Sequence, residues 1–159
     1  MNDILKLMEY DSKLTAAQIA DMLGKDEDEV ARAIAQAEAD NIIIGYNTII
    51  NWDKTDSEKS SALIEVRISP QRGDGYDRIA ERIYQYEEVD SVYLMSGDYD
   101  LAVTISGMTM KQVAEFVFAR LAPLDGVTGT ATHFIMKKYK DNHRIFEKRP
   151  EQEERLKFV

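Results

Sequence analysis

The chain contains no cysteine, which excludes disulfide bonds, thiolate zinc sites and cysteine nucleophiles. Only two histidines, His133 and His143, are available for metal binding or acid–base chemistry. His133 lies in a strand-like run between Thr132 and Phe134, which favours a packed strand residue over a catalytic base or metal ligand. The sequence therefore predicts no catalytic residue, no metal site and no cofactor.

The chain also lacks any apolar run of the roughly 20 residues that span a bilayer. Its first residues, MNDILKLMEYDSK, scatter charges among apolar positions, unlike a signal peptide. Together these absences predict a cytoplasmic protein without a membrane partner. Positive charge is scarce as well, because 20 Lys and Arg stand against 29 Asp and Glu, a formal net charge of −9. This balance argues against a protein that simply coats nucleic acid.

Residues 1–53 follow the pattern of a small helical domain. Apolar residues at helical spacing begin at Ile4, Thr15 with Gln18 forms a capping box for a second helix that Gly24 ends, and Asp26 caps a third. From Ile42 to Trp52, β-branched and aromatic residues predict a strand. Helix, helix, tight turn, helix and strand is the order of a winged helix-turn-helix.

The polar run 54–61 (KTDSEKSS) predicts a linker, and residues 62–140 predict a second domain. In it, two amphipathic helices alternate with strand-like segments at 62–68, 91–95, 101–105 and 127–139. This β-α-β-β-α-β order predicts a ferredoxin-like domain, so the fold class is α+β. Gly97-Asp98 predicts a two-residue hairpin turn. A second capping box, Thr109 with Gln112, begins a helix with a predicted buried stripe made of Met110, Val113, Ala114, Val117, Phe118 and Leu121.

A ferredoxin-like sheet carries its helices on one face and leaves the other face open. We therefore predict that a second copy of the chain covers the open face in a homodimer. Residues 141–159 form a charged C-terminal tail, either a helix packed on a neighbour or a solvated extension.

Four separated segments carry specific motifs. Residues 14–24 read LTAAQIADMLG and residues 41–46 read NIIIGY. Residues 92–101, VYLMSGDYDL, contain a G-x-x-D hairpin, and residues 130–137, TATHFIMK, contain a T-x-T-x-F strand. With the order of the elements, these motifs resemble the Lrp/AsnC family of transcription regulators over nearly the whole chain.

The resemblance implies a DNA-binding domain followed by a ligand-sensing and oligomerisation domain, often called the RAM domain. Its dimers commonly assemble further, for example into octamers. On double-stranded DNA, we predict that the third helix makes contact through Lys25, Arg32 and Gln36, while Thr15 and Gln18 seat the second helix. The resemblance also implies a site for a small amino acid or related metabolite between dimers, for which we predict Gly97, Asp98, Tyr99, Asp100, Thr130 and Thr132.

Two features depart from the family pattern. The family's recognition helix normally carries several basic residues, whereas residues 25–41, KDEDEVARAIAQAEADN, contain six acidic residues and two basic ones. We therefore expect weak DNA binding by each domain, strengthened by multivalency. In addition, Asp98 stands where the family often has glycine. A second carboxylate beside Asp100 favours a small neutral or basic amino acid over aspartate or glutamate.

Two alternative functions also fit the sequence. The acidic third helix also fits an oligomeric adaptor that senses amino acids without binding DNA. Sirohaem decarboxylases resemble the same layout, and such chemistry needs a histidine and basic residues that hold the macrocycle's carboxylates. The candidates for those roles are His133, Arg67, Arg72, Arg78 and Arg82.

Overall fold

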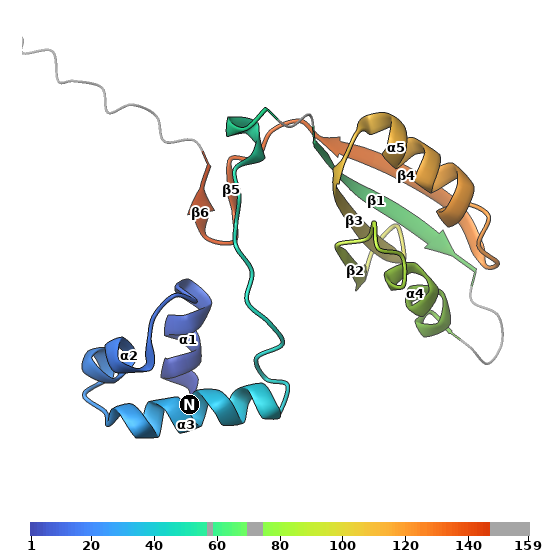
Figure 1. The fold of residues 1–159 in the computed structure, drawn as a ribbon. Coiled ribbons are helices and arrows are strands. Elements are labelled where there is room, and N and C mark those ends of the chain that lie inside the picture. The colour runs from blue at the N-terminus through green and yellow to red at the C-terminus, as the bar shows by residue number, and fades with distance from the viewer. Residues whose placement is uncertain (57–58, 70–74, 147–159) are drawn as a thin grey trace, which may run out of the picture. The chain divides into compact units, whose positions relative to one another are not determined.

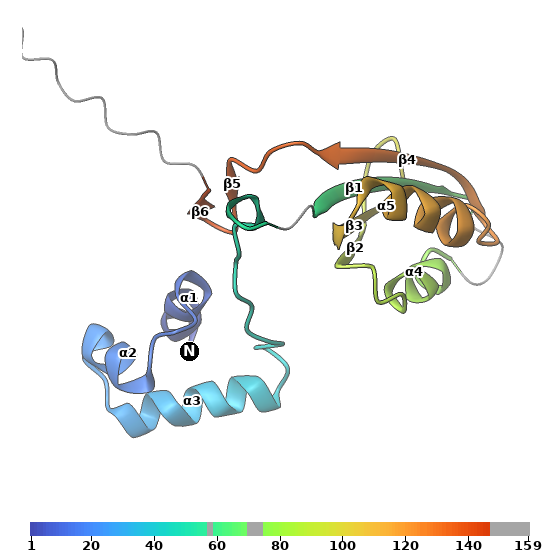
Figure 2. The same ribbon diagram turned by 45° about the horizontal axis from the view of Figure 1, so that its top comes forward.

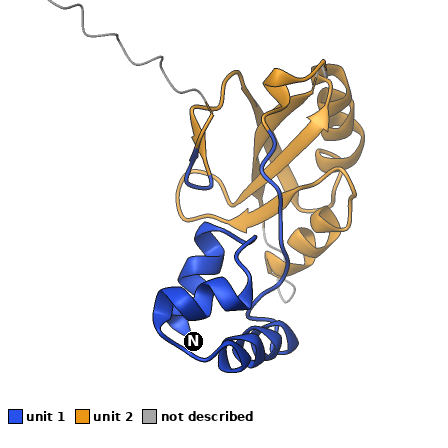
Figure 3. Cartoon of the chain, turned by 60° about the vertical axis from the view of Figure 1, so that its left-hand side comes forward, with its two compact units in different colours: residues 1–50, 142–144 blue, residues 51–141, 145–159 orange. Residues whose placement is uncertain are grey.

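The structure, a computed structural model, describes residues 1–56, 59–69 and 75–146. Arg72 and the predicted tail beyond residue 146 lie outside the described residues. The chain forms two compact units, coloured in Figure 3. Unit 1 comprises residues 1–50 together with 142–144, and unit 2 comprises residues 51–141 and the chain from residue 145 on.

Unit 1 contains three helices, α1 (Asn2–Tyr10), α2 (Ala16–Leu23) and α3 (Glu27–Ala39), as Figure 1 shows. Each helix is too short to be stable alone in water, so packing of its apolar face supplies most of its stability. The buried residues that meet between the three helices are Ile4, Met8, Ile19, Ala20 and Val30.

The predicted helix-turn-helix is confirmed, and its caps explain where α2 and α3 begin and end. The Thr15 hydroxyl and the Gln18 side chain form the predicted capping box at the start of α2. Gly24 ends α2 with a φ of 62°, a left-handed conformation that costs glycine little. Asp26 then caps α3 by accepting a hydrogen bond from the backbone N–H of Glu29 at 3.1 Å.

The strand predicted over Ile42–Trp52 is wrong. Residues 42–51, all of them described, form no strand, and the 3-10 turn η1 (Trp52–Lys54) follows. Among the described residues the backbone here has no neighbouring strand to pair with, and strand propensity without a partner does not form a ladder. Several apolar side chains are consequently left in solvent, among them Ile44, which is 92% exposed.

Unit 2 contains an antiparallel four-stranded sheet in the order β2-β3-β1-β4. Its strands are β1 (Ser60–Ile68), β2 (Ser91–Leu94), β3 (Leu101–Met108) and β4 (Val127–Ile135). Helix α4 (Asp77–Tyr84) joins β1 to β2, and helix α5 (Met110–Phe116) with the π-turn η2 (Val117–Leu121) joins β3 to β4. This order confirms the predicted ferredoxin-like arrangement.

Both helices cover the same face of the sheet, as Figure 2 shows. Alternate residues of β1 point toward them, and Ala62, Ile64 and Val66 are fully buried against Ile83 and Leu121. Within the described residues, the opposite face of the sheet carries no helix. It is the face on which we expect a second copy of the chain.

The predicted stripe of the second helix is only partly right. Val113 and Leu121 are buried as expected, but Phe116 fills the core while Phe118 is 82% exposed. Phe116 lies three positions after Val113 and therefore on the same face of the helix, whereas Phe118 lies five positions after Val113 and is turned away from that face. In η2, after Phe116, the backbone N–H of Ala122 reaches back to the carbonyl of Val117 and widens the last turn.

The last strands also differ from expectation. Strand β4 ends at Ile135 rather than at residue 139. A short hairpin follows, formed by β5 (Lys140–Asp141) and β6 (Arg144–Ile145), with Asn142 and His143 at its tip in left-handed conformations. Asparagine and histidine are among the non-glycine residues that adopt this conformation most readily.

Replacing Gly126 with alanine is expected to lower the free energy of unfolding by about 2 kcal/mol. Gly126 has a φ of +92°, and a Cβ there would lie 2.7 Å from Cδ1 of the buried Ile79. Gly45 is the matched control, because a Cβ added there meets nothing within 4 Å and its φ is not left-handed. Urea denaturation of Gly126→Ala and Gly45→Ala measures the difference, and equal stabilities would contradict this account.

Candidate functional site

Thr15 and Gln18 are two of the predicted DNA-contacting residues. Both side chains already accept hydrogen bonds from backbone N–H groups at the start of α2. The backbone N–H of Thr15 donates to Gln18 Oε1 at 2.9 Å, and the backbone N–H of Gln18 donates to Thr15 Oγ1 at 3.2 Å. These two side chains stabilise the N-terminus of α2. Both hydrogen bonds lie at the exposed surface of the protein.

The two predicted polar contacts that flank Arg32 are also paired. Lys25 lies in the turn before α3, not on the helix, and its Nζ is 2.6 Å from Glu29 Oε1. Gln36 donates from Nε2 to Asp40 Oδ1 at 2.9 Å. Arg32 lies on the exposed side of α3, and nothing in the described part of the chain pairs with its guanidinium. Arg32 is thus the cation of this helix that is free to bind a base or a phosphate.

The first turn of α3 is strongly acidic. Glu27, Asp28 and Glu29 are all exposed there, and Asp26 caps the helix. Carboxylates in a first turn stabilise the helix through its dipole. In a helix-turn-helix the N-terminal residues of the recognition helix meet base edges. Carboxylates at this position would repel DNA phosphates whatever the base sequence, so the acidic first turn opposes a contact between α3 and DNA.

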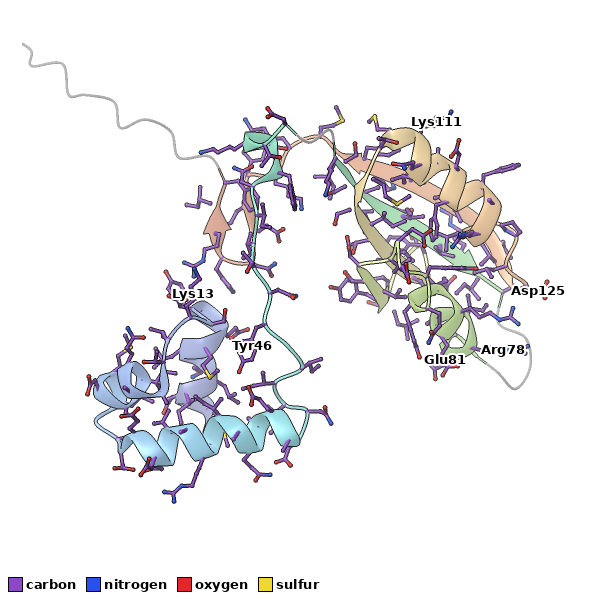
Figure 4. All side chains as sticks on the ribbon, in the orientation of Figure 1. Lys13, Tyr46, Arg78, Glu81, Lys111 and Asp125 are labelled. Carbon is purple, nitrogen blue, oxygen red and sulfur yellow. The ribbon has the colours of Figure 1, made fainter. Side chains whose placement is uncertain are left out.

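Tyr46, labelled in Figure 4, lies in the extended segment after α3 and connects this segment to the helix by a hydrogen bond. Its hydroxyl donates to Glu38 Oε1 at 2.7 Å. This hydrogen bond to Glu38 is the main reason why the pKa of Tyr46 lies above its ordinary value of 10.0, with burial and the charge of Glu38 adding to it.

The Tyr46 contact predicts a pH effect on stability. Because the pKa of Tyr46 is higher in the folded state than in the unfolded state, the contact stabilises the protein fully below pH 10 and is lost as the pH rises through the folded value. Tyr46→Phe should therefore be less stable than wild type at neutral pH and equally stable at strongly alkaline pH. Chemical denaturation across this range, with Tyr10→Phe as control, is the measurement. A difference that persists at alkaline pH would contradict it.

A large groove lies within unit 1, between α1, the extended segment and the hairpin tip. Its volume is about 1030 Å³, and its walls include Leu5, Tyr10, residues 42–49 and residues 142–144. In the wall of this groove, Arg144 donates a hydrogen bond to the backbone carbonyl of Tyr10 and lies 4.8 Å from the centre of the Tyr10 ring. The carbonyl belongs to the last turn of α1, where a cation is favourable.

The predicted effector loop is longer than expected. Leu94 pairs with Leu101, so the connection is the six residues 95–100 rather than a two-residue turn at Gly97-Asp98. The N–H of Met95 donates to the carbonyl of Asp100 at 2.8 Å. Gly97 and Asp98 are exposed, while Tyr99 and Asp100 are half-buried.

Asp100 ties this loop to β1. Its N–H donates to the carbonyl of Val66 at 3.1 Å, and its Oδ2 accepts from the N–H of Ile68 at 2.7 Å. The carboxylate thus takes part in the fold as well as carrying a charge at the loop. The other oxygen, Oδ1, takes no part in the contact with Ile68 and can accept from a ligand's ammonium.

The structure brings Thr130 and Thr132 to the same sheet as the loop but not to the same point. Leu101 pairs with Val66, and Val66 pairs with Thr130, so two strand spacings of about 4.8 Å separate Thr130 from the end of the loop. Thr132 lies on the same face of β4 as Thr130, two residues further from the loop, and it pairs with Ile64. One chain therefore does not bring the predicted effector residues within reach of a single small amino acid.

His133 was expected to be packed, and it is not. Its side chain is 57% exposed, on the open face of the sheet, with Nε2 3.1 Å from Glu65 Oε1. Among the described residues no three His, Asp or Glu side chains gather as metal ligands would. None of the helices in the described ranges is long and apolar enough to cross a membrane.

Comparisons with known proteins agree with the fold and the helix-turn-helix. A family model described as the Lrp/AsnC ligand-binding domain matches residues 61–145. The relative YugG of Bacillus subtilis, named as an uncharacterised HTH-type transcriptional regulator, is 45% identical over 146 residues, 91% of this chain and 88% of the relative. The HTH-type regulator LrpA of Pyrococcus horikoshii is 27% identical and covers 86% of this chain and 94% of its own length.

Solved structures share the fold. A transcriptional regulator of Neisseria meningitidis in complex with L-methionine has a TM-score of 0.71 at 21% identity, over 87% of this chain and 89% of its own. AsnC of Escherichia coli has a TM-score of 0.65 at 13% identity, over 86% and 89%. The curated relatives are named as regulators, not enzymes, which leaves the sirohaem-decarboxylase alternative without support. The chain belongs to the Lrp/AsnC family of transcription regulators.

Proposed function

We propose that this protein regulates transcription as a cytoplasmic oligomer that binds double-stranded DNA through α3 and responds to a small neutral or basic amino acid. One observation supports the DNA contact. Arg32 lies on the exposed side of α3, the second helix of the helix-turn-helix, and its guanidinium is unpaired within the described residues. Arginine binds guanine or phosphate with two parallel hydrogen bonds. Because Arg32 is surrounded by acidic residues, several copies must act together.

Recovery of genomic DNA fragments on the native oligomer, at low and at moderate salt, tests the DNA contact. We expect a few promoter fragments at both salts, lost in Arg32→Glu. Recovery of nothing even at low salt would overturn the proposal and favour the adaptor alternative, which the acidic first turn of α3 supports. Recovery that Arg32→Glu leaves unchanged would move the DNA contact away from α3.

The class of effector follows from the charges of the 95–100 loop. Asp98 is exposed and Asp100 has one carboxylate oxygen outside its hydrogen bond to Ile68, so the loop attracts an ammonium group and repels an acidic side chain. The match of residues 61–145 to a ligand-binding domain supports this use of the loop. Calorimetry with the twenty amino acids identifies the ligand. If no amino acid binds below millimolar concentration, the proposal of an amino-acid effector is overturned.

Assembly is proposed from the incompleteness of the site. Asp100 and Thr130 of one chain lie two strands apart, so a neighbouring chain must supply part of any pocket that holds both ends of an amino acid. We place the open sheet face inside a homodimer and the 95–100 loops between dimers, in an assembly such as an octamer. Binding between dimers would then couple the ligand to assembly. Light scattering measures the mass of the assembly. A mass of 18.2 kDa, that of one chain, at micromolar concentration would overturn the proposed assembly.

A further inference from the structure

The open face of the sheet, opposite α4 and α5, is defined by Leu63, Glu65 and Arg67 of β1 and by their partners on β3 and β4. Thr104 and Ala102 lie beside them on β3, and on β4 lie His133, Ala131 and Gly129. Polar groups on this face satisfy one another within the chain. The hydroxyls of Ser91 and Thr104 are 2.6 Å apart, and Glu65 meets His133 at 3.1 Å.

Arg67 is the exception. Its side chain is exposed, and within residues 1–56, 59–69 and 75–146 its guanidinium has neither a hydrogen bond nor an ion pair. An unpaired guanidinium is harmless in water but costly to bury. If the open face is covered, the covering surface must bring a carboxylate to Arg67.

A hollow of about 120 Å³ lies next to Arg67. It is lined by Glu65, Arg67, Gly129, Thr130 and Ala131, and it exists because the residues opposite Arg67 and Glu65 on β4 are glycine and alanine. Glu65 borders this hollow with a side chain that is 25% exposed. Its Oε1 faces His133, which leaves Oε2 available. Within the part of the chain that the structure describes, the open face thus carries the unpaired Arg67 and, at the next residue of β1 on the same face, Glu65 with the hollow beside it.

We propose that two copies of the chain pair through this face and that Arg67 of each copy enters the hollow of the other and binds its Glu65. The inference rests on the dimer proposed above and adds the residues that fix its register. A two-fold interface is self-complementary, so a contact from Arg67 to Glu65 is made twice. Both charges are then paired when water leaves the interface, and a dimer slipped by one strand position would bury Arg67 unpaired.

Reversing one charge at a time tests the pairing. In Arg67→Glu the face carries two carboxylates, and in Glu65→Arg it carries two cations, so each variant alone should dimerise at least about 100-fold more weakly because like charges meet across the interface. Equimolar mixing of the two variants should restore a dimer that contains one copy of each. The double variant with both changes should dimerise by itself, since the charges at positions 65 and 67 have simply exchanged places and the same two contacts form with reversed sign.

The matched control for the charge variants is Arg82→Glu, the same change of charge on the exposed side of α4. It should dimerise as wild type does. A steric variant tests the hollow independently of charge. Gly129→Val fills the recess from within its own chain, where a Cβ meets nothing within 4 Å, so the monomer should fold normally and dimerise weakly.

Sedimentation analysis of all variants, with circular dichroism to verify folding, gives the result. Dimers of unchanged affinity in both single charge variants would overturn the pairing while leaving the dimer itself intact. Folded single variants that stay monomeric after mixing would overturn it too. A wild-type monomer would instead overturn the proposed dimer, and with it this inference.

Discussion

Arg32→Gln is expected to lower the affinity of the native oligomer for its DNA by about 100-fold, because two copies of a contact worth about 1–3 kcal/mol each are lost from a dimer. Lys25→Gln, with the same change of charge in the turn before α3, should change this affinity by less than about threefold. The difference arises because Lys25 is already paired with Glu29 at 2.6 Å, whereas Arg32 is unpaired within the described residues.

Fluorescence anisotropy with a recovered promoter fragment at several salt concentrations measures both variants. Wild type and Lys25→Gln should show nearly the same slope of affinity against salt, while Arg32→Gln should show a shallower slope if Arg32 binds phosphate. An unchanged slope with lost sequence preference would assign Arg32 to a base. Equal losses in the two variants would show that the pairing of Lys25 in the free protein does not govern its availability to DNA.

Asp100→Asn is expected to abolish most amino-acid binding while leaving the fold as stable as wild type. Asparagine keeps an oxygen that accepts from the N–H of Ile68, but it has no charge for an ammonium. Loss of a charge-assisted hydrogen bond of about 1.5–3 kcal/mol corresponds to about 10- to 150-fold in affinity. Asp100→Ala should lose the same binding and, in addition, about 1–2 kcal/mol of stability, because the Ile68 N–H is left without its acceptor.

Asp98→Asn is the matched control in the same loop. The Asp98 side chain is exposed, so stability should not change. Its replacement should weaken binding of the native effector less than Asp100→Asn does and admit aspartate or glutamate more readily. Calorimetry and thermal denaturation of all three variants measure these outcomes. Full binding by Asp100→Asn would remove the ammonium contact from this residue.

The sequence predicts those parts of the fold that local chemistry determines. The capping boxes at Thr15 and Thr109 and the left-handed Gly24 lie where expected, because each depends on residues within four positions. The length of the 95–100 loop could not be predicted in this way. It depends on Asp100 reaching Ile68, 32 positions away, and on the pairing of Leu94 with Leu101. The widened turn at η2 likewise rests on how Phe116 and Leu121 fit the sheet.

In the candidate site, too, the sequence predicts features that depend on nearby residues and misses those that depend on pairing between distant segments. The sequence identified which side chains of the third helix are basic or polar, and it also contained the signal that most of them are paired. Lys25 with Glu29 and Gln36 with Asp40 are both four positions apart, the spacing at which side chains on one helical face meet. Arg67, unpaired within the described residues, and the hollow beside it could not be found from the sequence, since the hollow depends on Gly129 lying opposite Arg67 on the neighbouring strand.

The Arg144 contact with Tyr10 has a consequence for synthesis of the protein. Unit 1 includes residues 142–144, so this unit is complete only after the ribosome has passed residue 144. At roughly 5–20 residues per second, the hairpin tip follows residue 50 by about 5 to 20 s. During that interval a nascent chain already carries its three helices but has an uncapped carbonyl at Tyr10 and an open groove beside it. Unit 1, whose first 50 residues are made first, is therefore completed only after residues 51–141 of unit 2 have been made.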